Sequence, residues 1–275
     1  MASLASKLRA RIAQREIIVA PGIYDAFSAY RAEVAGFEAV FASGSALAAT
    51  HLARPDIGLL SATETAAIVS RITERVSIPV LVDADQGFGN RFDVARTVKL
   101  FERAGAAAIQ IEDQREVKPS SAPLSRPLIS ARDMADKIKS ARDALVDQDI
   151  MISARTDAMS SEGLETALER AQAYSEAGAD IIFVESLTER NQMEKLVEQF
   201  GDTKPLLHNL LRPTDAVRDA KTAEEIGYSV ALFPGTALGA VGDALDESFA
   251  ELKSSPKVSK NAKSVDRIGA DEFLN

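Results

Sequence analysis

The sequence predicts an α/β fold, a (β/α)8 or TIM barrel, followed by a C-terminal helical extension. Three observations support this fold class. Short apolar runs of strand length recur along the chain, amphipathic stretches of helix length separate them, and glycine precedes several of the runs. Barrels of about 250 residues usually form one domain, and this chain has 275 residues. We therefore expect a barrel domain over residues 1–252 and an extension over residues 253–275.

The expected strands are apolar along their whole length rather than at alternate positions. Continuous apolar character is required of a parallel sheet that is covered by helices on both faces. The runs are Ile17–Ala20, Ala39–Ala42, Pro79–Val82, Ala107–Ile111, Ile150–Ala154, Ile181–Val184, Pro205–Leu207 and Val230–Phe233. About eight such units indicate a closed barrel.

Between the runs, apolar residues recur at i, i+3, i+4 and i+7, which is the pattern of a helix with one buried face. The clearest helices are Phe92–Ala104, Ala131–Leu145, Leu164–Ala177 and Asp215–Ile226. Several helical stretches end in glycine, at Gly36, Gly105, Gly178 and Gly227, which suits the left-handed C′ position before a short turn. A doubly wound open sheet is the alternative, but no GxGxxG or GxxxxGK[ST] motif supports it.

Two segments do not follow the alternation of strand-length and helix-length stretches that a barrel requires. Gln114–Ser130 is polar and rich in proline and serine, and it is too long for an ordinary βα loop, so we expect a mobile active-site lid there. The tail from Lys253 onward is rich in lysine and serine before Ile268–Leu274, and it is interpreted as a docked or partly disordered extension.

Composition excludes several classes of protein. The net charge of −9 disfavours nucleic acid and anionic membranes as partners, although a metal ion and backbone donors can still attract an acidic substrate locally. The chain has no cysteine, which excludes disulfides and thiolate chemistry. Met1–Glu16 lacks an unbroken apolar segment, and no later stretch is long enough to cross a bilayer. We expect a cytoplasmic protein.

Polar residues are dense where the predicted strands end, which is where barrel enzymes carry their catalytic groups. These residues are Asp83, Asp85, Glu112, Asp113, Arg155, Asp157, Glu185 and Asn209. Several carboxylates at one barrel mouth would repel one another without a hard cation, and oxygen ligands suit Mg²⁺ or Mn²⁺. Because Asp83 and Asp85 are two residues apart, we expect them on the same side of an extended strand end. We therefore expect a metal-assisted reaction.

Structural roles compete with functional ones at several of these positions. Asp113 and Asp157 could each be a helix N-cap, and Arg155 could be an ion-pair partner for Glu112 or Glu185. The planar guanidinium of Arg155 equally suits a substrate carboxylate. The two histidines, His51 and His208, are far apart in sequence and are interpreted as surface residues or as residues outside the first ligand layer.

Four motifs together resemble the 2-methylisocitrate lyase branch of the isocitrate lyase and phosphoenolpyruvate mutase superfamily. They are Asp83-Ala84-Asp85-Gln86-Gly87-Phe88-Gly89-Asn90, Val94-Ala95-Arg96-Thr97-Val98, Ile111-Glu112-Asp113-Gln114 and Ser153-Ala154-Arg155-Thr156-Asp157-Ala158. The similarity extends from about Pro21-Gly22 to Leu232-Phe233-Pro234, which is most of the chain. This ordered set is highly specific.

The resemblance implies a role for each matching position. A substrate oxyanion and carboxylate cradle is implied for Ser43, Gly44 and Ser45. Metal binding is implied for Asp85, with Asp83 and Glu112 holding metal-bound water. Asp56 matches a further active-site acid and Arg155 the arginine that clamps the substrate carboxylate, while Glu185 and Asn209 match residues that line the rest of the pocket. The family stabilises an enolate as a bond to carbon or phosphorus breaks.

The chain departs from that branch in one loop. Lyases of the branch carry Lys-[Lys/Arg]-Cys-Gly-His after Glu-Asp-Gln, and the ungapped match here is Lys118-Pro119-Ser120-Ser121-Ala122. Ser120 therefore stands at the position of the proton-donating cysteine, and a serine hydroxyl is a much weaker acid than a thiol of pKa about 8.5. The change leaves open a decarboxylase, a hydrolase of a 2-oxo acid, a phosphorus–carbon enzyme or a lyase with another proton donor.

The preferred function is a Mg²⁺-dependent lyase of small 2-oxo or 2-hydroxy di- or tricarboxylates, related to methylisocitrate, dimethylmalate or oxaloacetate. Phosphonopyruvate hydrolase or phosphoenolpyruvate mutase chemistry is the alternative among enzymes. A catalytically silent, metabolite-binding barrel is the alternative outside them. The expected partner is a small anionic metabolite, and the resemblance implies a homotetramer that exchanges C-terminal helices, with Ile268–Leu274 able to reach a neighbour.

Overall fold

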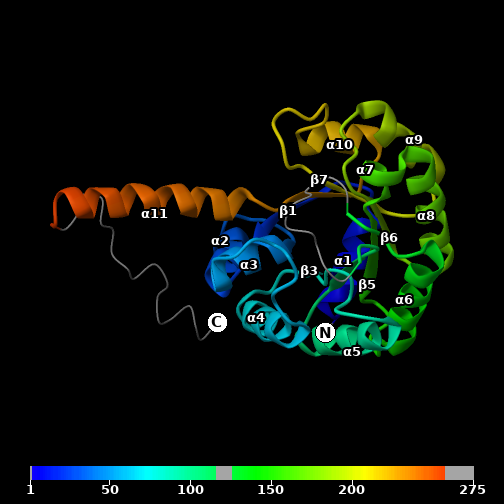
Figure 1. The fold of residues 1–275 in the computed structure, drawn as a ribbon, viewed down its shortest axis with the longest axis horizontal. Coiled ribbons are helices and arrows are strands. Elements are labelled where there is room, and N and C mark those ends of the chain that lie inside the picture. The colour runs from blue at the N-terminus through cyan, green and yellow to red at the C-terminus, as the bar shows by residue number, and fades with distance from the viewer. Residues whose placement is uncertain (1, 116–125, 258–275) are drawn as a thin grey trace. The chain divides into compact units, whose positions relative to one another are not determined.

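The computed structural model describes residues 2–115 and 126–257 of the chain. It divides into two compact units, residues 1–238 and the part that begins at Gly239. In the first unit, eight parallel strands close into a barrel in sequential order (Figure 1). The strands are β1 Ile18–Ile23, β2 Val40–Ala42, β3 Val80–Asp83, β4 Ala108–Glu112, β5 Met151–Thr156, β6 Ile181–Val184, β7 Leu206–Asn209 and β8 Val230–Phe233. Every predicted strand is confirmed to within a few residues.

The helices surround the barrel in Figure 1, as the covered parallel sheet requires. Those of the first unit are α1 Leu4–Ile12, α2 Ala26–Val34, α3 Gly44–Leu52, α4 Ala62–Arg75, α5 Arg91–Arg103, α6 Ala131–Ala144, α7 Ala158–Glu162, α8 Leu164–Glu176, α9 Arg190–Phe200 and α10 Ala220–Ile226. Three of the four clearest predicted helices match these bounds closely. The predicted Asp215–Ile226 helix was too long, because Asp219 is the N-cap of α10 and accepts from the Thr222 N–H at 2.8 Å.

Register fixes which side chains meet at the barrel mouth. Strand β1 pairs with both β2 and β8, which closes the ring, and β4 pairs with β5 so that Glu112 lies beside Arg155. The strand residues are almost entirely buried, and the helices contribute the outer layer of the same core. Glycine also acts as predicted at the helix ends. Gly105 has φ +86° and Gly227 has φ +122°, values that favour glycine.

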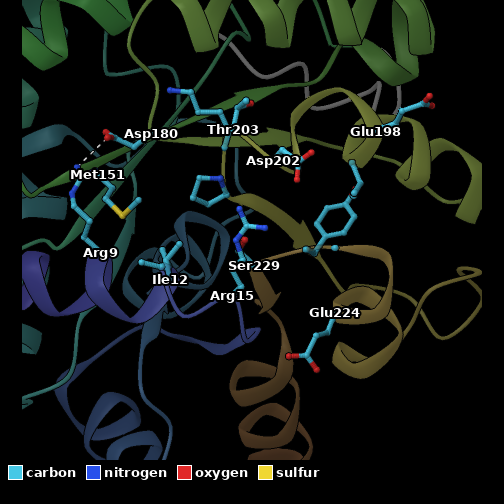
Figure 2. A pocket seen from close by; sticks show the side chains of 17 residues that line it. Arg9, Ile12, Arg15, Met151, Asp180, Glu198, Asp202, Thr203, Glu224 and Ser229 are labelled. Atoms are coloured by element: carbon cyan, nitrogen blue, oxygen red, sulfur yellow. Dashed lines mark hydrogen bonds and ion pairs between the residues drawn. The ribbon is translucent and has the colours of Figure 1, made fainter.

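The amino-terminal end of the barrel holds a cavity of about 780 Å³, between α1, the end of α9 and the residues that precede β6 to β8 (Figure 2). Two of its cations have partners within the protein. Arg9 pairs with Asp180 at 3.0 Å, and the Lys204 ammonium donates to the Ala179 carbonyl at 2.6 Å. None of the predicted site residues lines this cavity. These contacts secure α1 against the barrel, so we interpret this end as structural.

Helix α11, Thr236–Ser254, extends through the start of the second unit. Large apolar side chains repeat along it at Val241, Leu245, Phe249 and Leu252, each more than 40% exposed. Among the described residues, no helix is long and apolar enough to cross a membrane.

Candidate active site

A polar cavity of about 220 Å³ lies at the carboxyl ends of the strands. It brings together most of the site residues that the sequence predicted. These are Ser43, Ser45, Asp56, Asp83, Arg155, Glu185 and Asn209. They come from the βα loops or strand ends of β2, β3, β5, β6 and β7, and so lie on the face where barrel enzymes act. This cavity is smaller than the one at the amino-terminal end, but it collects residues suited to catalysis, which that one does not.

Arg155 is the most constrained cation of the cavity. Two parallel hydrogen bonds, at 3.0 and 2.9 Å, join its guanidinium to Asp157, and Glu112 and Glu185 lie at 3.4 and 3.5 Å. The ring of Phe183 lies 5.3 Å below the guanidinium carbon. Burial alone would lower the pKa of Arg155, but the three carboxylates raise it well above its usual value, so the group stays charged.

Asp157 is not the simple helix cap that was one reading of its position. It precedes α7, yet its side chain makes no capping hydrogen bond and is instead committed to Arg155. Burial would raise the pKa of this carboxyl, but the charge and hydrogen bonds of Arg155 outweigh burial and lower it. Asp157 therefore acts as a fixed anion that orients the guanidinium.

Behind this pair, Asp113 is fully buried and accepts hydrogen bonds from several elements. The Thr156 hydroxyl and the Tyr174 hydroxyl donate at 2.7 Å, the Asp157 N–H donates at 3.0 Å, and Arg170 lies at 3.5 Å. Burial is the main cause of the raised pKa of Asp113. Asp113 is likewise not a helix cap, because it anchors the end of β5 and so holds the backbone that carries Arg155 and Asp157.

The geometry expected for Asp83 and Asp85 needs correction. Strand β3 ends at Asp83, and Asp85 adopts a left-handed conformation with φ +46°, so the two do not sit on one side of an extended strand. The turn nevertheless brings them together, since the Asp85 N–H donates to Asp83 at 3.1 Å. Both line a second, smaller cavity with Asp56, beside the main one. Aspartate tolerates this backbone conformation, and such strain concentrates at functional sites.

The predicted anion cradle lies at the start of α3. The hydroxyls of Ser43 and Ser45 are 3.1 Å apart, and the Gly44 N–H donates to Asp83 at 3.3 Å. A Cβ on Gly44 would lie 3.0 Å from the Asp83 carboxylate, so a larger residue there would have to displace that side chain slightly. The first N–H groups of a helix favour anions, which suits a substrate carboxylate near this point.

On the opposite wall, the Asn209 amide donates to Glu185 at 2.9 Å. The Oδ1 atom of Asn209 is buried and has no hydrogen-bond partner within residues 2–115 and 126–257. His51 is exposed, but His208 is only 4% exposed, so it is not a surface residue. Burial lowers the pKa of His208 to about 4, which keeps the ring neutral.

Two more cations line the cavity. Arg126, which precedes α6, belongs to the segment that the sequence predicted to close over an anionic ligand, whereas Arg212, three residues after β7, was not assigned to the pocket from the sequence. A search for cations in the segments that follow each strand would have found Arg212. Ser120 and most of the predicted lid lie outside the described residues, so their assignments stay predictions.

The metal assignment also stays a prediction. Within the described ranges, no three His, Asp, Glu or Cys side chains form a group that could hold a metal ion, so Asp83, Asp85 and Glu112 are not a compact cluster. The donor chemistry still fits Mg²⁺, which is usually bound through one or two carboxylates with water and substrate completing the shell. Asp83 and Asp85 in one small cavity supply such a pair.

With this fold and site established, the chain can be assigned to a family. The phosphoenolpyruvate phosphomutase family model matches residues 8–253, and the chain belongs to this family. It is therefore an enzyme of the phosphoenolpyruvate mutase and isocitrate lyase superfamily, as the sequence motifs predicted.

Three individual proteins show what this chain is similar to within the family. A 2,3-dimethylmalate lyase from Eubacterium barkeri is 40% identical over 91% of this chain and 86% of its own length. A 2-methylisocitrate lyase from Aeropyrum pernix is 45% identical over 89% of this chain and 78% of its own. A crystal structure of phosphonopyruvate hydrolase with oxalate and Mg²⁺ superposes with a TM-score of 0.84 at 28% identity, over 99% of this chain and 94% of that one.

Proposed function

We propose that this enzyme is a Mg²⁺-dependent carbon–carbon lyase of small 2-hydroxy or 2-oxo di- or tricarboxylates. The observation that carries the proposal is the composition of one cavity. Arg155, Asp83 and the start of α3 meet there, and these are groups that can hold a carboxylate, a hard cation and an oxyanion. The relatives at 40% and 45% identity are both named as lyases of such acids.

Each group has a defined task in this proposal. Arg155, already oriented by Asp157, binds the substrate carboxylate next to the reacting carbon. The N–H groups at the start of α3 stabilise negative charge on the substrate oxygen as it develops. Bound Mg²⁺ would supply a Lewis acid for the same oxygens. Asp85 would hold it, and the family motif assigns metal-bound water to Asp83 and Glu112. Glu112 also lies 3.4 Å from Arg155 and helps to orient it.

The bond change is a cleavage next to the hydroxyl-bearing carbon. In a 2-hydroxy acid, the hydroxyl gives its proton to a carboxylate of the cavity and becomes a carbonyl, while the electron pair of the breaking carbon–carbon bond moves onto the departing carbon. A carboxylate on that carbon delocalises the pair, and a proton then completes the second product. Ser120 occupies the sequence position of the family's proton donor, and we keep it as the candidate for that last step.

Phosphorus–carbon chemistry is the second candidate, favoured by the similarity to phosphonopyruvate hydrolase. We rank it lower because that likeness is 28% identical, whereas the lyase relatives reach 40% and 45%. A silent barrel is ranked lowest, because Asp56, Asp83 and Asp85 around one cavity are the type of ligand that a hard cation requires.

A panel assay tests the proposal. Release of pyruvate or another 2-oxo acid is followed with methylisocitrate, dimethylmalate and oxaloacetate, and phosphonopyruvate is included for the alternative. We expect one of the three carboxylic acids, methylisocitrate, dimethylmalate or oxaloacetate, to be cleaved in the presence of Mg²⁺ and not in the presence of EDTA. Cleavage of phosphonopyruvate alone would replace the proposal with the alternative, and no turnover of any compound would favour the silent barrel.

A further inference from the structure

Arg212 lies in the segment that connects β7 to α10, three residues after Asn209. Its side chain lines the same cavity as Arg155, Glu185 and Asn209. Barrel enzymes take their specificity from these βα segments, because their side chains face the bound substrate. The position alone makes Arg212 a candidate for contact with the part of the substrate that does not react.

The charges of the cavity distinguish Arg212 from Arg155. Arg155 has three carboxylates within 3.5 Å, from Glu112, Asp157 and Glu185. A substrate carboxylate that approaches Arg155 therefore also meets these acids. In contrast, within residues 2–115 and 126–257 the guanidinium of Arg212 forms no ion pair and no hydrogen bond. Its charge is thus available to a second anionic group.

Asn209 adds a second observation on the same wall. Its amide nitrogen donates to Glu185 at 2.9 Å, so its Oδ1 atom must be the acceptor. That oxygen is buried and has no partner among the described residues. A buried acceptor left without a donor is unfavourable, and a substrate hydroxyl would satisfy it. Asn209 and Arg212 together present an acceptor and a cation, which match a hydroxyl and a carboxylate.

We propose that Arg212 binds a second substrate carboxylate, at the opposite end of the substrate from the carboxylate that Arg155 binds. This contact makes the enzyme selective for acids that carry two anionic groups. Asn209 accepts a hydrogen bond from the hydroxyl between the two ends. This inference rests on the proposed function, because it assigns the far end of the same cavity. Arg212 is exposed, so an anion bound at the far end of the cavity would restrict its side chain at some cost in conformational entropy.

A binding experiment isolates the far carboxylate. Calorimetric dissociation constants are measured with Mg²⁺ for malate, for its C4 monoamide, which lacks only the far charge, and for oxalate, which lacks the far end. We expect the wild-type protein to prefer malate over the monoamide by about tenfold or more, as for a charge-assisted contact. Arg212→Gln should remove this preference while leaving oxalate binding unchanged, and Arg212→Lys should retain part of it.

Arg218→Gln is the matched control. Arg218 lies in the same segment and is exposed, but its guanidinium donates to the Pro213 carbonyl at 3.3 Å and does not line the cavity. The control should keep the wild-type preference. A preference that survives Arg212→Gln, or an equal loss for all three ligands, would overturn the inference. Because the readout is binding, it is independent of turnover, so failure of the lyase assay is a separate result.

Discussion

Replacement of Asp113 tests whether a buried carboxylate holds the arginine end of the site together. In Asp113→Ala, the hydroxyls of Thr156 and Tyr174, the Asp157 N–H and Arg170 all lose their shared acceptor. A buried donor left unsatisfied costs about 1–3 kcal/mol, but such costs are not additive because water can enter the space. Breaking a buried charged network by removing one partner costs about 3–5 kcal/mol.

We therefore expect Asp113→Ala to lower the free energy of unfolding by about 4 kcal/mol. For a domain of this size, that corresponds to roughly 8–16 °C in Tm. Asp113→Asn should lose less, about 1–2 kcal/mol, because burial already favours the neutral carboxyl and the amide keeps one acceptor. Thermal unfolding followed by calorimetry and urea titration measures both values.

Asp143→Ala is the control for this experiment, because Asp143 is an exposed aspartate on α6. It should change stability by less than about 0.5 kcal/mol. If Asp113→Ala unfolds within about 1 kcal/mol of the wild-type protein, the four donors do not depend on this acceptor, and the account of how Arg155 is positioned is wrong.

The remaining predictions concern pH, metal and assembly. Burial lowers the pKa of His208 from 6.5 to about 4. Below about pH 6.5 the unfolded chain binds a proton at this residue and the folded protein does not, so the free energy of unfolding is highest above pH 6.5 and falls by ~3 kcal/mol toward pH 4. His208→Gln should flatten that part of a pH–stability curve and exposed His51→Gln should not, and an unchanged curve in the first variant would refute this. Asp85→Ala should abolish Mg²⁺-dependent activity and Mg²⁺ binding by calorimetry while circular dichroism stays normal, so full activity would remove the metal assignment. We also predict a homotetramer, which Leu245→Asp with Phe249→Asp on exposed α11 should dissociate; a wild-type monomer by light scattering at micromolar concentration would contradict it.

The sequence alone identified the parts of this protein that local pattern encodes. Continuous apolar runs located all eight strands, and glycine after the helical stretches located the turns that precede them. Since parallel strands in a barrel end on one face, the polar residues after each run could be assigned to one site. Ordered motifs then led to the family, and the family model covers nearly the same residues.

Contacts between distant residues could not be obtained in this way. Asp113 and Tyr174 are 61 positions apart, and no periodicity links them. Their hydrogen bond joins α8 to the residue that follows β4 and depends on tertiary packing, so a helix cap remained an equal interpretation of Asp113 from the sequence. The turn at Asp85 was also missed, because a strand pattern does not reveal the residue at which the backbone leaves the extended region.

Sequence and tertiary structure determine different features of this protein because the underlying interactions act over different separations along the chain. Periodicity and turn chemistry act over a few residues, so the chain's own pattern determined the barrel and the face that carries the site. Burial and charge pairing act through space. Only the tertiary structure decided that three carboxylates surround Arg155 while Arg212 has none beside it in the described part of the chain, because those distances depend on side chains from separate strands and loops.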